Sequence, residues 1–343
     1  MPRTNQAAWL PGPNEKLEIR PSELVKPGPG QVLVKNRAVS INPVDWKFQD
    51  GYSPTGKPRI MGQDVAGEVV EVGDGVTDFC VGQRVLAHVV GLATGRPQDS
   101  AFQEFSVAPA LSTCPIPDDV SFEQATVLPL AISTAAHGLF SSEYLALPLP
   151  RHNVQGSTGN KALLVWGAAS SVSCVAVQLA VAAGVKVVAT ASKKNFALCK
   201  DLGASEVFDY NSPSVVGDLT AALQKYDLIG AYDAISTRDT QLNTAQVLAQ
   251  LGGGTLAITL RPADEIPATV TVKPVFAVNI IVSDKDKAVG KAIWHDFLPG
   301  ALKSGQIKPL PKPEVFGHGL ESLQGALDKQ RAGVSAVKVV VTL

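Results

Sequence analysis

The pattern of apolar and polar positions is clearest between Lys161 and Asn195. An apolar run ends at Gly167, small residues lead into a helical pattern that stops at Gly184, and a second apolar run covers 185–192. Strand, tight turn, helix and strand in this order are typical of the βαβ unit of dinucleotide-binding folds. Any parallel α/β crossover can have such a turn, so the pattern predicts a nucleotide site only in this wider context.

The chain before this unit is rich in short strand patterns. From Gln6 to about Val127, alternating or apolar runs are separated by Gly and Pro. Many short strands with glycine corners are typical of a compact, partly open barrel. The pattern changes near Val120, where helix-starting residues appear, so we place the end of a first, β-rich domain at residue 127.

Strand and helix patterns alternate after Asn195, which predicts a doubly wound parallel sheet. We place its last strand at 276–282, and a long helix at 284–305. The final strand pattern, from Ala336 to the last residue, should return to pair with the first domain. The predicted fold is therefore α/β, with domains at 1–127 and 128–282 and a returning C-terminal segment at 283–343.

Composition limits the classes of function. The chain has 343 residues, of which 45% are hydrophobic and 18% charged, as in a globular protein. Its net charge of -1 argues against nucleic acid or an acidic membrane as a partner. Neither a signal peptide nor a membrane span is expected, because the N-terminal stretch is polar and Gln178 and Lys186 interrupt the most apolar region. We expect a cytoplasmic protein, monomeric or homodimeric.

The second strand of the βαβ unit does not end in an acid. Asp or Glu there would hydrogen-bond a free ribose 2′-hydroxyl, whereas this strand closes with Ser192, Lys193, Lys194 and Asn195. Cationic and hydroxyl donors suit a 2′-phosphate. We therefore predict NADPH as the cofactor; the alternative is a solvated loop with two surface lysines.

Three segments carry a resemblance to a known family. The first, at residues 41–47, reads INPVDWK; the second combines residues 192–196, SKKNF, with 203–210, GASEVFDY; the third, at 131–135, reads AISTA. Together with the order of the modules, they resemble the medium-chain dehydrogenase/reductase superfamily over nearly the whole chain. The chain is most similar to zinc-free quinone oxidoreductases and to fungal trans-acting enoyl reductases of the lovastatin type, which implies a GroES-like first domain and a Rossmann second domain.

Zinc ligands are missing where zinc alcohol dehydrogenases of this superfamily carry them. The cysteine position falls in the INP segment, and the Gly-His-Glu motif reads Gly62–Gln63–Asp64. The four cysteines are far apart, as expected for reduced thiols, and the five histidines are scattered. A tetrahedral zinc site cannot be assembled from these residues, so no metal is predicted.

The resemblance implies contacts to the cofactor in several segments. They are the phosphate-binding turn, Ala169, Ser170, Ser171 and Val172; the adenosine end, Ser192, Lys193, Lys194, Asn195 and Tyr210; and the nicotinamide end, Val44, Asp45, Trp46, Lys47, Ile258, Thr259, Val337 and Lys338. Lys47 could orient the cofactor or relay a proton, or could be an exposed lysine.

The resemblance also implies two substrate segments. An acyl channel would be lined by Leu130, Ala131, Ile132, Ser133, Thr134, Ala135, Ala136 and His137, and a lid would contain Val275, Phe276, Ala277, Val278 and Asn279. Thr134 and Lys47 are the candidate catalytic residues. Close helix packing would also favour the small residues of the first segment.

The preferred hypothesis is an NADPH-dependent, metal-free reductase that adds hydride to an activated C=C bond. Its expected substrate is a small-molecule or carrier-bound acyl group, most simply an enoyl thioester from a polyketide or peptide synthase. A quinone or enone oxidoreductase, or a non-catalytic NADPH-binding regulatory protein, are the alternatives. No residue is marked by its pattern as a dedicated proton donor.

Overall fold

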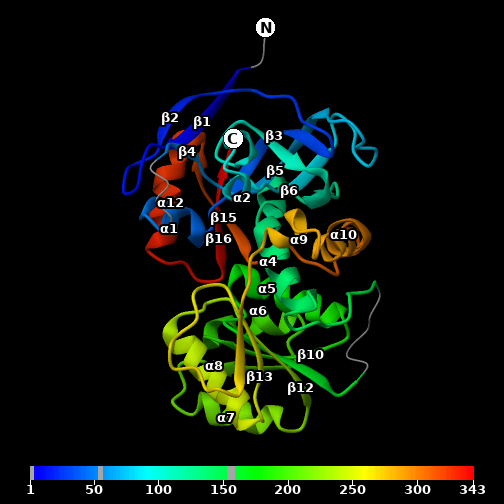
Figure 1. Cartoon of the computed structure of the whole chain (residues 1–343), viewed down its shortest axis with the longest axis vertical. Helices are drawn as coiled ribbons and strands as arrows, with labels where there is room; N and C mark the ends of the chain where they lie inside the picture. The colour runs from blue at the N-terminus through cyan, green and yellow to red at the C-terminus, as the bar shows by residue number, and fades with distance from the viewer. Residues whose placement is uncertain (1–3, 53–56, 153–158) are drawn as a thin grey trace. The chain divides into compact units, whose positions relative to one another are not determined.

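The computed structural model describes residues 4–52, 57–152 and 159–343, and it contains two compact units (Figure 1). The first unit combines the chain up to Leu130 with Pro309–Leu343, and the second covers Ala131–Lys308. The return to the first unit therefore begins at Pro309 rather than at residue 283. Residues 283–308 stay with the second unit, where Ile293, Trp294 and Phe297 are buried.

Two sheets form the first unit. A seven-stranded sheet has the order β15-β16-β3-β5-β6-β8, with β7 also paired to β3, and a three-stranded sheet has the order β2-β1-β4. The final strand β16 pairs antiparallel with β3. The strands are β1 (Asn5–Leu10), β2 (Glu18–Ser22), β3 (Gln31–Ser40), β4 (Arg59–Ile60), β5 (Asp64–Val72), β6 (Arg84–His88), β7 (Phe105–Pro109), β8 (Thr113–Pro115), β15 (Lys312–His318) and β16 (Val337–Thr342).

Short helices connect these strands. Helix α1 begins at Pro43, whose fixed φ suits a first helical position, and the Asp45 carboxylate accepts a hydrogen bond from the Asn42 N–H at 2.8 Å. This hydrogen bond fixes the start of α1. The helices are α1 (Pro43–Gln49), α2 (Gly91–Thr94), α3 (Phe122–Ala125) and α12 (Leu323–Arg331).

The second unit is a doubly wound parallel sheet of six strands, in the order β11-β10-β9-β12-β13-β14. Its strands are β9 (Lys161–Trp166), β10 (Lys186–Ala191), β11 (Glu206–Asp209), β12 (Asp227–Asp233), β13 (Gly254–Ile258) and β14 (Val270–Pro274). The predicted α/β class is confirmed. The predicted last strand at 276–282 is wrong: β14 takes that place, and residues 279–282 are helical because a short apolar run is compatible with either structure.

The helices of the second unit surround this sheet. They are α4 (Pro129–Phe140), α5 (Ser171–Ala182), α6 (Phe196–Asp201), α7 (Val215–Leu223), α8 (Arg238–Gln250), α9 (Asn279–Val282), α10 (Lys287–Lys291) and α11 (Leu298–Lys303). The single helix predicted at 284–305 is interrupted by a π-helical turn at Ala292–Phe297. Pro299 explains this interruption, since it has no N–H to bond to the carbonyl of His295.

Crossing a bilayer takes a long and strongly apolar helix, and none is found in the part of the chain that the structure describes.

Candidate functional site

A tight turn joins β9 to α5 in the second unit. Gly167 has φ +67°, and a Cβ atom there would lie 2.5 Å from the Ile235 side chain. The Gly167 N–H donates to the Thr190 hydroxyl at 3.0 Å, so β10 holds the turn in place. Glycine is required both for this backbone conformation and for the close approach.

The turn presents a free hydroxyl at the start of α5. Ser170 is the N-cap residue, yet its Oγ makes no cap hydrogen bond; it is buried and has no hydrogen-bond partner among the described residues. Ala169 beside it is buried and small. The amino end of a twelve-residue helix carries unpaired N–H groups and a positive partial charge. This donor set fits a pyrophosphate, and the residues are those predicted from the sequence, Ala169 to Val172.

The cations predicted to choose the cofactor lie where β10 ends. Lys193 and Lys194 are both exposed in a 3-10 turn that Ser192 precedes, and Asn195 Nδ2 donates to Ser192 Oγ at 3.2 Å. The Tyr210 N–H donates to the Ala191 carbonyl at 3.4 Å, so Tyr210 follows the neighbouring strand at the same edge. The structure thus brings the predicted adenosine-end residues together at the carboxyl edge of the sheet.

The loop after β12 completes this edge, and sequence reasoning missed it. Asp233 is buried, burial raises its pKa, and its Oδ1 accepts the N–H groups of Ile235 and Ser236, each at 2.9 Å. Ser236 has φ +55°, and its Oγ accepts the N–H of the predicted residue Thr259 at 2.8 Å. A strand ending in Asp, with Ser236 and Thr237 three and four positions later, is the signal that could have indicated this turn.

The helix predicted to line an acyl channel is held by buried polar contacts. The Thr134 carbonyl accepts the Tyr232 hydroxyl at 2.8 Å, and Ser133 Oγ accepts the Trp294 indole N–H at 3.2 Å. All four residues are buried. Ser133 is therefore tied to the segment after α10, which the sequence did not suggest.

His137 connects the two predicted substrate segments. Its Nδ1 accepts the Phe276 N–H at 3.3 Å, its ring centroid lies 4.4 Å from that of Tyr144, and its Nε2 lies 3.6 Å from Asp286 Oδ2. Burial lowers the pKa of His137, an effect that Asp286 opposes. Val275 is buried, whereas the Phe276 side chain is 60% exposed.

The first-unit residues that we predict at the nicotinamide end belong to two places. Lys47 in α1 is half-buried, its Nζ lies 5.5 Å from the centroid of the Trp46 ring, and burial lowers its pKa. Trp46 Nε1 donates to Gln330 of α12. Val44 is half-buried and Asp45 is buried on the same helix.

Lys338 lies in a buried polar cluster formed with Asn42 and Asp64. Its Nζ is 2.5 Å from Asn42 Oδ1 and 3.2 Å from Asp64 Oδ2, and the residue is 4% exposed. Asp64 also accepts hydrogen bonds from the Ser40 hydroxyl and the Asn42 amide, both at 2.7 Å, and from the Leu130 N–H at 2.6 Å. The ammonium of Lys338 is thus engaged inside the unit, and Val337 is half-buried beside it.

Two further titratable groups are buried near this cluster. Burial raises the pKa of Asp45 to about 7 and lowers the pKa of His88 to about 4. His88 Nε2 lies 3.4 Å from Gln63 Oε1. Across residues 4–52, 57–152 and 159–343, no three His, Cys, Asp or Glu side chains are grouped so that they could hold a metal ion.

Comparisons with known proteins agree with this geometry. Residues 28–118 match the family described as alcohol dehydrogenase GroES-like domain, and residues 171–285 match zinc-binding dehydrogenase. The chain is 41% identical to dehydrogenase orsE of Emericella nidulans, with 99% of each chain covered. It belongs to the medium-chain dehydrogenase/reductase superfamily. The resemblance proposed from the sequence is confirmed.

Two other similarities refine this picture of a medium-chain dehydrogenase/reductase. Trans-enoyl reductase himH of Aspergillus japonicus is 38% identical, over 99% of this chain and 97% of that protein. A mycobacterial protein solved in complex with NADPH is 26% identical, with a TM-score of 0.71, 99% of this chain covered and 100% of that one. The chain is accordingly an oxidoreductase of this superfamily, with a Rossmann-type nucleotide-binding unit.

Proposed function

We propose that the protein uses NADPH to reduce the activated C=C bond of an enoyl thioester. The choice of NADPH over NADH rests on the end of β10. Two exposed lysines follow Ser192 there, and the strand ends without an acidic residue. The himH relative, named a trans-enoyl reductase, and the mycobacterial structure with NADPH support the reaction and the cofactor. The acyl group would be presented by a polyketide or peptide synthase.

The residues of the second unit would bind and orient the cofactor. Ser170 and the amino end of α5 would hold the pyrophosphate, and Lys193 and Lys194 would pair with the 2′-phosphate. Tyr210 would contact the adenosine end, and Ile258 and Thr259 the nicotinamide end. Bound NADPH would supply the hydride for the β-carbon of the substrate.

Protonation of the α-carbon needs a group that can hold a proton and release it. Lys47 is our candidate, because burial lowers the pKa of its ammonium and so makes it a better acid. Asn42 and Asp45 would fix the start of α1 and thereby position Lys47. Thr134 would contact the substrate or the nicotinamide amide.

Oxidation of NADPH should be measured with a crotonyl thioester, with a crotonyl group on a carrier protein and with a quinone. The proposal requires turnover of the thioesters to the saturated products, identified by mass spectrometry. Turnover of the quinone alone would instead make the protein a quinone reductase. Tight NADPH binding without turnover of any acceptor would favour a non-catalytic role.

A further inference from the structure

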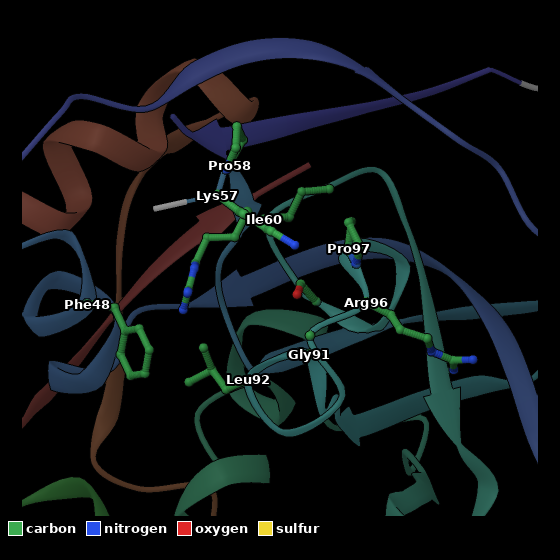
Figure 2. Close-up of a pocket in the computed structure, with 11 residues that line it drawn as sticks. Phe48, Lys57, Pro58, Ile60, Gly91, Leu92, Arg96 and Pro97 are labelled. Atoms are coloured by element: carbon green, nitrogen blue, oxygen red, sulfur yellow. The ribbon is translucent and has the colours of Figure 1, made fainter. Parts of the chain in front are cut away.

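A pocket of about 600 Å³ lies within the first unit (Figure 2). Its apolar wall includes Phe48 of α1, Leu92 of α2 and Ile60 of β4, and Figure 2 shows Phe48 and Leu92 on one side with Pro97 across from them. Phe48 directly follows the segment of α1 that we assign to the cofactor. The volume suits part of a small organic ligand.

The charged groups that line this pocket are all cationic. Lys57, Arg59 and Arg96 contribute to it, and no described lining residue carries a carboxylate. Arg96 is already neutralised, because its Nε and Nη2 donate to the Asp99 carboxylate at 2.8 and 3.0 Å. In Figure 2 its side chain also runs away from Phe48 and Leu92.

Lys57 and Arg59 are the other two cations that line this pocket. Lys57 is exposed and pairs with no carboxylate of the described residues. The Arg59 guanidinium lies 5.2 Å from the centroid of the Phe48 ring, which places its charge beside the apolar wall. An apolar wall next to two cations matches a chain of methylene, methyl and amide groups that ends in a phosphate.

We propose that this pocket binds the phosphopantetheine arm of the thioester substrate, with Lys57 and Arg59 on its phosphate and Phe48 and Leu92 against its carbon chain. This inference rests on the proposed function, since an enoyl thioester reaches the enzyme on such an arm. Arginine and lysine both pair well with phosphate oxygens, and the arginine fork can do so with two parallel hydrogen bonds. Carrier proteins and coenzyme A both contain this arm, so the pocket would accept it from either.

Calorimetric titration of the full chain, saturated with NADPH, tests the site without turnover. The probes are 4′-phosphopantetheine and pantetheine, which differ only in the phosphate. We expect the phosphorylated probe to bind at least about tenfold more tightly, and Lys57→Ala and Arg59→Ala each to remove most of that difference. Lys26→Ala, which changes an exposed lysine of the same unit outside the pocket, should leave the difference intact.

Equal affinities for the two probes, or a phosphate preference that survives both substitutions, would overturn the inference. Lys57→Ala remains decisive if Arg59→Ala unfolds, because Lys57 is exposed. A weaker affinity of the Lys57→Ala variant for NADPH would also overturn the inference, because Lys57 would then bind the cofactor rather than the phosphopantetheine arm. The titration and the turnover assays test different claims. Failure to reduce any enoyl thioester would refute the proposed function, whereas the titration would still show whether the pocket binds the phosphopantetheine arm.

Steady-state kinetics distinguish the two sources of the arm. Crotonyl-phosphopantetheine, crotonyl-coenzyme A and a crotonyl carrier protein should all show a KM raised about tenfold in Lys57→Ala. An effect confined to crotonyl-coenzyme A would place the contact on its nucleotide phosphates and contradict the proposal.

Discussion

The ammonium of Lys338 lies 3.2 Å from the carboxylate of Asp64, and both side chains are buried in the first unit. Lys338 belongs to the last strand, β16, and Asp64 to β5, so the pair connects the end of the chain to its first domain. Asn42 bonds to both residues and directly precedes α1. The contact therefore fixes the helix that carries Lys47.

Removing one partner of this pair should be costly. Lys338→Met leaves the Asp64 carboxylate buried without its cation, and we expect the free energy of unfolding to fall by about 3–5 kcal/mol. Urea denaturation measures the change. Lys312→Met, on the neighbouring strand β15 and exposed, is the matched control and should change stability little. Adding Asp64→Asn to Lys338→Met should recover part of the loss, and a fully additive double variant would contradict this account.

The buried carboxyl of Asp45 predicts a pH dependence of stability. Its pKa in the folded protein is about 7, raised by burial from about 4 in the unfolded chain. Between about pH 4 and pH 7 the folded state keeps a proton that the unfolded state has released. The contribution of Asp45 to the free energy of unfolding therefore falls as pH rises through this interval. The stability of Asp45→Asn relative to the parent should increase over the same interval.

Urea unfolding of both proteins at several pH values measures this difference. His88, whose pKa is lowered to about 4, acts in the opposite direction, but it is present in both proteins and cancels in the comparison. A difference that stays constant between pH 4.5 and 7.5 would show that Asp45 is ionised throughout.

The lysines after β10 should decide between the two nicotinamide cofactors. Lys193→Ala combined with Lys194→Ala should raise the KM for NADPH about 10- to 100-fold, because charge-assisted contacts to the 2′-phosphate are lost. The KM for NADH should stay nearly constant. Lys161→Ala is the control, since Lys161 is exposed at the amino end of β9, the opposite edge of the sheet. A double variant that still prefers NADPH strongly would refute the assignment.

His137 should control the segment that contains Phe276. His137→Leu leaves the Phe276 N–H without its acceptor, and we expect a loss of about 1–3 kcal/mol in stability together with faster hydrogen exchange at that amide. Tyr144→Phe is a matched control. It removes only the hydroxyl that donates to the Pro274 carbonyl at 2.9 Å and leaves the His137 acceptor of the Phe276 N–H in place. Unchanged exchange at Phe276 in His137→Leu would show that other contacts hold the segment.

Local patterns in the sequence were enough for the architecture and for the position of the lysines that follow β10. The βαβ unit around Gly167 could be predicted because one turn, one helix period and two apolar runs lie within thirty-five consecutive residues. The cations after β10 could be predicted for the same reason. The segment at 276–282 was placed wrongly because its apolar residues suit a strand or a helix equally well.

Contacts between residues far apart in the chain were decided by the tertiary structure alone. Asn42 and Lys338 are 296 positions apart, and His137 and Phe276 are 139 apart, so neither pairing leaves a periodic signal. The sequence by itself determined the two-domain plan, the family and the lysines at the end of β10. Only folding decided that Lys338 would be buried against Asp64 and that Lys57 and Arg59 would share an apolar pocket, because burial and charge pairing depend on which strands become neighbours.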